Sequence, residues 1–253
     1  METVAPPRFI QGQGTSEACW EPYINASVLP SGTVTDLIHP SGTVHIVAPH
    51  PDDEVLGCGG MMQQLSALGV PVCVWAVTDG ERSHPPTPSR TMHSLARLRT
   101  RESEQALAIL SSAICRYAVQ LPDGAVSAAE EQLGHYLSMK VKKNDTVFAP
   151  WRLDGHPDHE AAARAALYAA QQQGCRFIEV PIWGWHWADP TKGEFPLERA
   201  LRIPLSADEL KRKTLAIHQF HSQLGIDEQT NQAPILPDYA LVRYLRSFEV
   251  VLL

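Results

Sequence analysis

Short apolar runs rich in β-branched residues alternate with helical segments along most of the chain, and this alternation constrains the fold more than any other feature. Val44–Ala48 is such a run, Glu54–Leu68 carries apolar residues along one helical side, and Val70–Val77 is a second run. The three segments together span about 35 residues, which suits a parallel β-α-β crossover. This stretch predicts two parallel strands with a helix packed across them.

The alternation continues to the end of the chain. Further strands are expected at Ile114–Leu121, Thr146–Pro150, Arg176–Ile182 and Phe248–Leu253, and further helices at Ser89–Leu110, Ser127–Met139, Pro157–Gln173 and Ala207–Phe220. This pattern predicts an α/β fold whose mostly parallel sheet has helices on both faces. Ligands of such folds lie outside the carboxyl ends of the strands, so the site is expected at that edge.

The size of the chain suits a single domain. Its 253 residues, 44% of them hydrophobic, are enough to bury a sizeable core. We therefore expect one α/β domain over residues 1–253. Residues 1–40 carry many Pro, Gly and Ser and show little periodicity, so they are expected to form an arm packed on this domain.

Charge and cysteine content limit the binding partners and the cellular compartment that we expect. The 21 basic residues are scattered among 28 acidic ones, which argues against a nucleic-acid partner. Five cysteines without a CxxC pair are typical of reduced thiols in an intracellular protein. The sequence has no signal-peptide pattern and no unbroken apolar run of about 18 residues. We expect a cytoplasmic protein without a membrane span.

Two segments that combine histidine and acid follow predicted strands. The first, 50-HPDDE-54, comes directly after Val44–Ala48, and the second, 154-DGHPDH-159, follows Thr146–Pro150. Both strands end at the same edge of the sheet, so the fold brings together segments more than a hundred residues apart. Histidine and carboxylate are ligands of catalytic zinc, and a cation also offsets the repulsion among three adjacent acids. The sequence therefore predicts a metal site at this edge.

Spacing suggests roles within the two segments. In a strand-to-helix turn, side chains three residues apart converge, so His50 and Asp53 can bind one ion while Asp52 lies beside it as a base for water. Either His156 or His159 completes the site, and the other donates a proton or stabilises an oxyanion. Each segment alone also fits a helix cap or a surface turn. Their occurrence together at strand ends favours the metal.

These segments, in this order, resemble the PIG-L/LmbE family of zinc-dependent N-deacetylases, which includes de-N-acetylases of N-acetylglucosaminyl compounds. The resemblance covers roughly residues 44–250 and rests on 50-HPDDE-54, 78-TDGE-81, Arg101 and Glu104 in 101-RESE-104, 122-PDG-124, 156-HPDH-159 and 218-HQFHSQ-223. It implies a Rossmann-like sheet, a zinc ion and hydrolysis of an acetamide. It also implies that His50, Asp53 and His159 bind the zinc and that Asp52 is the general base.

The resemblance implies further roles around the metal. His156 would support the oxyanion or protonate the leaving amine, and Asp158 would orient its imidazole. Arg101, near the sugar or its attached group, and Asp123, as a partner of a hydroxyl, would bind substrate. The chain departs from some family members at Asp154, where they have a tyrosine that helps to polarise the carbonyl. This departure leaves oxyanion stabilisation to zinc and His156.

Four features have two interpretations each. Glu54 either stabilises the first turn of its helix, which we favour, or makes a hydrogen bond behind the metal ligands. Arg101 also fits an ordinary helical ion pair with Glu104. The tryptophans of Trp183–Trp187 either cover a substrate or pack against the domain. The string 57-GCGG-60 lacks the Lys-Ser/Thr of a phosphate loop, so its glycines are expected to let the helix approach the sheet.

The residues and the resemblance together predict a zinc-dependent hydrolase that removes an N-acyl group, with acetyl expected, from an amino sugar or a sugar-linked small molecule. Two alternatives stay open: an amidase for a larger acyl group or a glycosyl conjugate, and a non-catalytic metal- or sugar-binding homologue. Ligation by two histidines and one carboxylate accepts other divalent ions, such as iron. The sequence does not specify the substrate or the oligomeric state, and it is compatible with a homo-oligomer.

Overall fold

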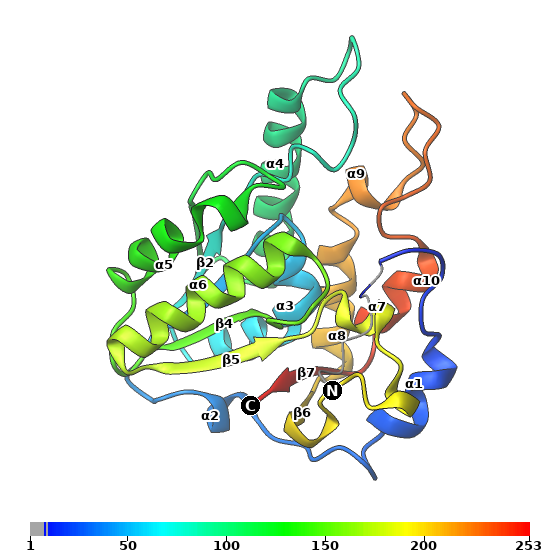
Figure 1. The fold of residues 1–253 in the computed structure, drawn as a ribbon. Helices are drawn as coiled ribbons and strands as arrows, with labels where there is room; N and C mark the ends of the chain where they lie inside the picture. The colour runs from blue at the N-terminus through cyan, green and yellow to red at the C-terminus, as the bar shows by residue number, and fades with distance from the viewer. Residues whose placement is uncertain (1–7, 9) are drawn as a thin grey trace, which may run out of the picture.

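A single sheet of seven strands forms the centre of the protein (Figure 1). The computed structural model describes residue 8 and residues 10–253. The strands follow the spatial order β3-β2-β1-β4-β5-β7-β6. Their bounds are β1 Val44–Ala48, β2 Val72–Ala76, β3 Ile114–Ala118, β4 Thr146–Pro150, β5 Arg176–Val180, β6 Ala200–Pro204 and β7 Phe248–Leu252.

The strand pairing confirms the α/β fold with a mostly parallel sheet. Strands β1 to β5 pair in parallel, while β7 runs antiparallel to β5 and to β6. The sequence pattern did not predict β6. This five-residue strand contains Arg202, ends at Pro204 and lies at the edge of the sheet, so it lacks the continuous apolar run of a buried strand.

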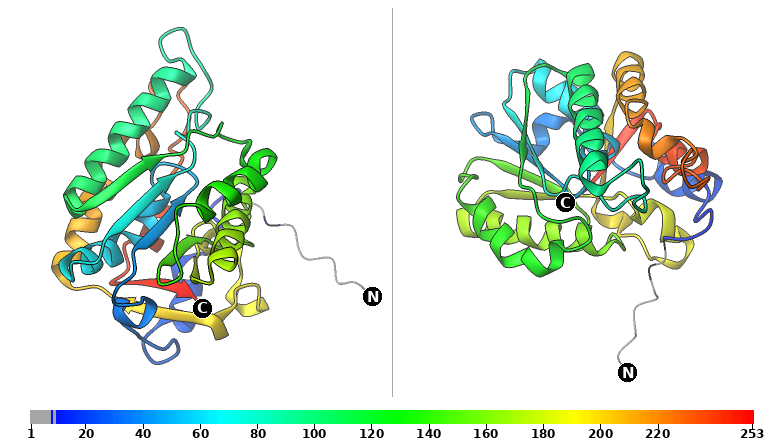
Figure 2. Two further views of the ribbon diagram at one scale, coloured as in Figure 1. Left: turned by 90° about the vertical axis from the view of Figure 1, so that its left-hand side faces the viewer. Right: turned by 90° about the horizontal axis from the view of Figure 1, so that it is seen from above.

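Helices cover both faces of the sheet (Figure 2). On one face, β-strand residues such as Val47 and Ala149 pack against α5 and α6, and on the other, Ile46 and Phe148 share a core with α3 and α4. The longer helices are α3 Asp53–Ala67, α4 Met92–Leu110, α5 Glu130–Ser138, α6 Pro157–Gln173 and α8 Ala207–Ile217. The short elements are α1 Glu17–Ile24, α2 Val34–Leu37, η1 Val126–Ala129, α7 Gly184–Trp187, η2 Pro190–Lys192, η3 Leu197–Arg199, α9 His221–Leu224, α10 Asp238–Leu241 and η4 Val242–Tyr244.

Helix α3, which follows β1, lies close against the sheet. A Cβ atom added at Gly57 would lie only 2.7 Å from Cγ1 of Val180 in β5. A larger residue at this position would push the helix off the strand. The expectation that the glycines of 57-GCGG-60 allow close packing is confirmed at this position.

A buried ion pair reaches into the middle of α3. The carboxylate of Glu249 in β7 accepts hydrogen bonds from the backbone N–H groups of Gly60 and Met61, both at 2.7 Å. Nζ of Lys213 in α8 donates to the same carboxylate at 2.7 Å and to the carbonyl oxygen of Leu56 at 2.8 Å. These backbone groups ordinarily bond only within a helix. The pair therefore fixes α3 to elements from the last part of the chain.

The segment before β1 packs on the body of the protein through α1. Trp20 is fully buried, and its ring meets Trp185 and Phe195 edge-on at centroid distances of 4.9 and 5.1 Å. The expected arm begins at residue 1, and its residues 1–7 and 9 lie outside the described part of the chain. Each helix in the described part is too short or too polar to cross a bilayer.

Candidate metal centre

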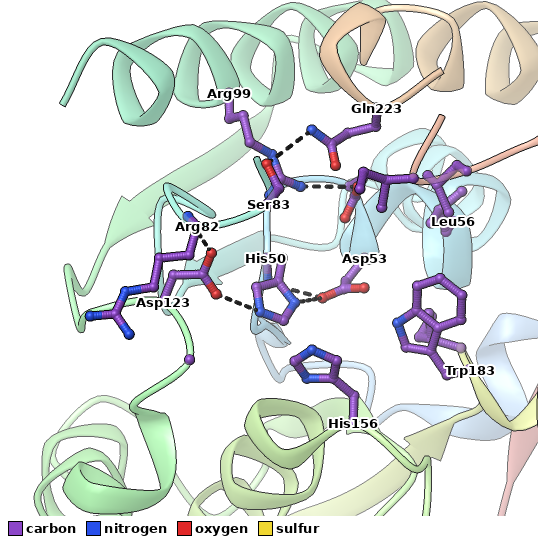
Figure 3. A pocket seen from close by; sticks show the side chains of 15 residues that line it. His50, Asp53, Leu56, Arg82, Ser83, Arg99, Asp123, His156, Trp183 and Gln223 are labelled. Carbon is purple, nitrogen blue, oxygen red and sulfur yellow. Dashed lines mark hydrogen bonds and ion pairs between the residues drawn. The ribbon is translucent and has the colours of Figure 1, made fainter. Parts of the chain in front are cut away.

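A pocket of about 290 Å³ opens at the carboxyl ends of the parallel strands (Figure 3). Every one of these five strands contributes a following turn to its lining, and segments 223 and 235–236 complete the wall. Both predicted segments, 50-HPDDE-54 and 154-DGHPDH-159, reach this edge. The topology therefore places their histidines and acids within contact of one another.

Three side-chain atoms form a nearly equilateral triangle beside the pocket. Nδ1 of His50 lies 3.2 Å from Nε2 of His159 and 3.3 Å from Oδ2 of Asp53. The third side, from Nε2 of His159 to Oδ2 of Asp53, measures 3.2 Å. Neighbouring ligand atoms around a tetrahedral ion with bonds of about 2.0–2.1 Å are about 3.3 Å apart. The triangle thus has the dimensions of one face of a tetrahedral zinc site.

The electrostatics around the triangle favour a bound cation. Burial lowers the pKa of His159, but the Asp53 and Asp154 carboxylates outweigh it and raise the pKa to about 9. Burial also disfavours the charged form of His50, but contacts with three carboxylates outweigh it and hold the pKa of His50 well above its usual value. A site that attracts protons this strongly also attracts a metal ion, which competes for the same atoms.

The far nitrogen of His159 is held by the Asp154 carboxylate. Nδ1 of His159 lies 2.8 Å from Oδ2 of Asp154, and both side chains are fully buried. The same carboxylate accepts the backbone N–H groups of residues 182–184, each at 2.9 Å. Contacts of this kind fix the orientation and tautomer of a ligating imidazole. Asp154, where some family members have a tyrosine, therefore holds the imidazole of His159, a contact that the sequence did not predict.

His50 is held in a similar way by two carboxylates. Its Nε2 atom lies 3.2 Å from Oδ1 of Asp123 and 3.3 Å from Oδ2 of Asp158. The Asp158 carboxylate also accepts the backbone N–H groups of Gly124 at 2.7 Å and Val126 at 3.1 Å. We expected Asp158 to orient His156, and this was wrong, because its side chain contacts His50. Only the backbone N–H of Asp158 reaches His156, donating to Nδ1 at 3.2 Å.

Asp52 lies beside the triangle in a strained conformation. Its φ of 138° falls in a region that residues with a Cβ atom rarely adopt. The backbone N–H of Asp52 donates to the Glu54 carboxylate at 3.1 Å, and Ser103 donates to the other oxygen of Glu54 at 2.6 Å. Glu54 therefore supports the backbone at Asp52. Glu54 also lies in the first turn of α3, so the structure is compatible with both of its interpretations.

A guanidinium holds the Asp52 side chain. Nη2 of Arg99 donates to Oδ2 of Asp52 at 3.1 Å and to the carbonyl oxygen of Pro51 at 2.8 Å. Arg99 passes close to Gly80, whose φ is 64° and where a Cβ atom would lie 2.0 Å from Nη1. Burial raises the pKa of Asp52 to about 7, although the Arg99 charge opposes this shift. A carboxylate with this pKa takes up and releases a proton near neutral pH.

His156 faces the pocket from the start of α6. Its ring meets that of His50 edge-on, with a centroid distance of 4.8 Å. Burial, together with the neighbouring His159 and His50, lowers the pKa of His156 to about 3. The ring is therefore neutral near pH 7. Since Nδ1 accepts a hydrogen bond from the backbone of Asp158, the proton is assigned to Nε2, which is then a donor.

About half of the chain matches the model of a known protein family. Residues 45–170 match the PIG-L family, described as GlcNAc-PI de-N-acetylase. The chain belongs to the PIG-L family. No curated protein matches the chain.

Solved structures share the fold of this PIG-L family member. The conserved protein TT1542 from Thermus thermophilus is 28% identical, with 71% of this chain and 79% of that chain covered and a TM-score of 0.53. N,N'-diacetylchitobiose deacetylase from Pyrococcus horikoshii is 22% identical, with coverages of 70% and 68% and a TM-score of 0.52. A deacetylase of the teicoplanin biosynthetic pathway is 18% identical, with coverages of 83% and 96% and a TM-score of 0.60.

The arginine that reaches the site is not the one expected from the PIG-L resemblance. Arg101 and Glu104 are exposed on the outer side of α4, outside the pocket lining. The expectation for Arg101 was therefore wrong in position. Arg99, two residues earlier, lines the pocket, and Glu102 accepts hydrogen bonds from Ser222 at 2.8 and 2.6 Å. A shift of two residues turns a side chain to the other side of a helix.

Asp123, the other expected substrate-binding residue, does line the pocket. Its Oδ2 atom accepts the backbone N–H of Arg82 at 2.8 Å, while its own N–H donates to Glu81 at 2.9 Å. Burial raises the pKa of Asp123, but the contact with His50 reverses this and lowers the pKa to about 2. Asp123 is thus an ionised acceptor at the side of the pocket.

The tryptophans of Trp183–Trp187 divide between the two interpretations. Trp183 lines the pocket. Trp185 is buried against Trp20, and Trp187 stacks on Trp151 with a centroid distance of 5.6 Å. Trp183 therefore faces the pocket, and the other two tryptophans hold the segment in place.

Proposed function

We propose that this protein is a metal-dependent N-deacetylase that hydrolyses the acetamide of an amino sugar or of a sugar-linked small molecule. The observation that carries the proposal is the triangle of His50, Asp53 and His159, with sides of 3.2–3.3 Å, beside a buried carboxylate at Asp52. The PIG-L family and the chitobiose and teicoplanin-pathway deacetylases support this chemistry. Zinc is the metal that best fits the ligand set.

His50, Asp53 and His159 would hold the metal, which when bound polarises the amide carbonyl and makes water more acidic. Asp52 removes a proton from the attacking water while the oxygen of that water bonds to the carbonyl carbon. Its pKa of about 7 suits this transfer near neutral pH. The Arg99 guanidinium keeps the Asp52 carboxylate in place while it carries the charge.

His156 completes the reaction from the other side of the pocket. Its Nε2–H donates to the carbonyl oxygen as that oxygen gains negative charge, which stabilises the transition state. The proton held by Asp52 then passes to the leaving nitrogen as the C–N bond breaks, and the products are acetate and a free amine. The sugar hydroxyls require polar partners, which Asp123 and Ser83 supply at the pocket wall.

Release of a free amine from N-acetylated sugars tests the proposal. The panel contains N-acetylglucosamine, N-acetylgalactosamine and glycosides of both, assayed with protein treated with chelator and then supplied with Zn²⁺ or Fe²⁺. We expect metal-dependent amine release from at least one substrate, and we expect Asp52→Asn to abolish turnover while the protein retains metal. The matched control is Asp189→Asn, a partly exposed helix cap outside the pocket lining.

Two results would contradict the proposal. Near-normal turnover by Asp52→Asn would exclude Asp52 as the base. Stoichiometric zinc without amine release from any substrate would favour a non-catalytic homologue that binds a metal or a sugar.

A further inference from the structure

The pocket has a polar side and an apolar side. In Figure 3, Asp123 and Arg82 lie on one side of His50, and Leu56 and Trp183 lie on the other side, beyond Asp53. Asp123 lies on the polar side, together with Arg82 and Ser83. It contacts Nε2 of His50, whereas Asp53 and His159 contact Nδ1 of the same ring. The Nε2 edge of the His50 ring therefore faces the polar side, and its Nδ1 atom is a corner of the triangle.

The apolar side lies beyond Asp53. Leu56 follows Asp53 by one helical turn on α3 and so projects from the same helix side. Trp183 and Ile182 are fixed by the Asp154 carboxylate, which also holds His159. These side chains share the pocket lining with Leu236 and Ile235, which come from the segment before α10.

A substrate amide at the triangle has two ends, and the pocket offers each a different surface. The amine half carries the sugar hydroxyls, which need the hydrogen-bond partners of the polar side. The acyl half consequently faces the apolar side. An acetyl group has a single methyl to place there, and it leaves Ile235 and the partly exposed Trp183 in contact with water. Ile235, for example, is 38% exposed. Leu56, Ile182 and Leu236 are already almost fully buried and form the base of this side.

From this arrangement we propose that the site accepts N-acyl chains longer than acetyl, with the chain lying on Leu56, Ile182, Trp183, Leu236 and Ile235. The proposal rests on the proposed amide hydrolysis. A longer chain would cover the apolar surface that Trp183 and Ile235 expose, so each further methylene in contact with these two side chains adds binding energy. Trp183 offers the largest flat surface of this wall.

The rim of the apolar side is held firmly enough to act as a binding surface. Nη1 and Nη2 of Arg90 donate to the Asp227 carboxylate, at 2.7 and 2.8 Å. This bond joins the segment after β2 to the segment that carries Ile235, and both stand out from the body at the top of Figure 1. The backbone N–H of Leu236 donates to the carbonyl oxygen of Gln223 at 2.9 Å, which ties the rim to α9.

A series of N-acyl glucosamines tests the proposal, with acetyl, butanoyl, hexanoyl and octanoyl groups and amine release as the readout. We expect kcat/KM to rise by about two- to fourfold for each methylene that contacts the wall. In Trp183→Ala and Ile235→Ser this rise with chain length should be lost. Ile226→Ser is the matched control, because Ile226 lies on the same segment, is 63% exposed and is absent from the pocket lining.

A second series separates the acyl side from the sugar side. It keeps the acetyl group and varies the aglycone among methyl, butyl and octyl glycosides of N-acetylglucosamine. A rise with aglycone length alone would assign the apolar wall to the aglycone and overturn the proposal. Cleavage of acetyl but not of longer acyl groups would also overturn it while leaving the proposed deacetylase function intact. Absence of amine release from every substrate would contradict both proposals.

Discussion

Arg99 donates to Asp52 at 3.1 Å in a setting where both side chains are almost fully buried. Breaking such a pair by removing one partner leaves a buried charge without compensation, which costs about 3–5 kcal/mol. We therefore expect Arg99→Gln to lower the free energy of unfolding by about this amount and to lower kcat. Urea unfolding and amine release measure the two effects. Arg101→Gln, at an exposed position of the same helix, should stay within about 0.5 kcal/mol of the wild type. Equal stability of the two variants would contradict the pairing.

The backbone strain at Asp52 predicts an unusual order of stability. Asp52→Gly and Asp52→Ala both remove the carboxylate and its bond to Arg99, so they differ mainly in the Cβ atom. Because φ at this position is 138°, glycine adopts the conformation without the penalty that alanine incurs. We expect Asp52→Gly to be more stable than Asp52→Ala by about 1–3 kcal/mol. Chemical denaturation of the two variants measures their free energies of unfolding. A more stable alanine variant would show that the strain is absent.

Removal of the charge at Asp154 should weaken metal binding. Asp154→Asn keeps the shape of the side chain, but it no longer offers His159 a carboxylate. Contacts of this type are typically worth a factor of about 10–100 in metal affinity. Competition with a chromogenic chelator measures the affinity for Zn²⁺, and Asp189→Asn serves again as the control. An unchanged affinity in Asp154→Asn would show that the Asp154 carboxylate does not support His159 in metal binding.

The ion-pair network around Glu179 predicts part of the acid sensitivity. Oε1 and Oε2 of Glu179 accept hydrogen bonds from Arg152 at 2.8 Å and Arg199 at 2.6 Å. Burial raises the pKa of Glu179, but these arginines outweigh it and hold the pKa below the usual 4.5. The resulting stabilisation is present above the unfolded pKa and is lost as the pH falls through the lower folded pKa. Glu179→Gln should therefore lose less stability than the wild type between about pH 5 and 3, as measured by urea midpoints. An equal loss of stability in Glu179→Gln and the wild type over this pH range would contradict the prediction. The control is Glu198→Gln, which changes an exposed residue next to Arg199.

Loss of the ion pair between Arg90 and Asp227 should affect substrate binding more than the rate of hydrolysis. Neither side chain lines the pocket, but the bond fixes the segment that carries Ile235. We expect Asp227→Asn to raise KM severalfold with a smaller change in kcat, because the rim loosens while the metal site stays intact. Steady-state kinetics give both constants. Glu228→Gln, next in sequence and exposed, should leave them unchanged, and an equal effect of the two variants would contradict the role of the bond.

The burial of Arg99 is predictable from the helical period of its own segment. Helix α4 buries Leu95, Ala106 and Leu110, and the 3.6-residue period of that stripe passes through Arg99 and Glu102. Charged residues on an otherwise apolar stripe indicate a buried interaction. The motif comparison alone selected Arg101, which belongs to the exposed side. The helical period therefore carried a signal that the short motif did not.

Other side-chain contacts in the site could not be predicted from the sequence around each residue. The alternation of strands and helices predicted which segments meet, because parallel strands share one edge. The support of His159 by Asp154 depends on a carboxylate that also accepts N–H groups from residues 182–184, and only the folded chain brings these together. The contact of Asp158 with His50 instead of His156 likewise depends on how two turns from different strands face each other. The spacing of residues along the chain identifies candidate site residues. Which of these residues contact each other depends on the direction of their side chains across the pocket.

The Glu249 carboxylate that reaches into α3 has a consequence for biosynthesis. Asp53 begins α3, yet the groups that fix this helix, Lys213 and Glu249, are made only after most of the chain has left the ribosome. A nascent chain synthesised as far as α6 carries every metal ligand but lacks this anchor. The anchor of α3 can therefore form only after β7 has been synthesised.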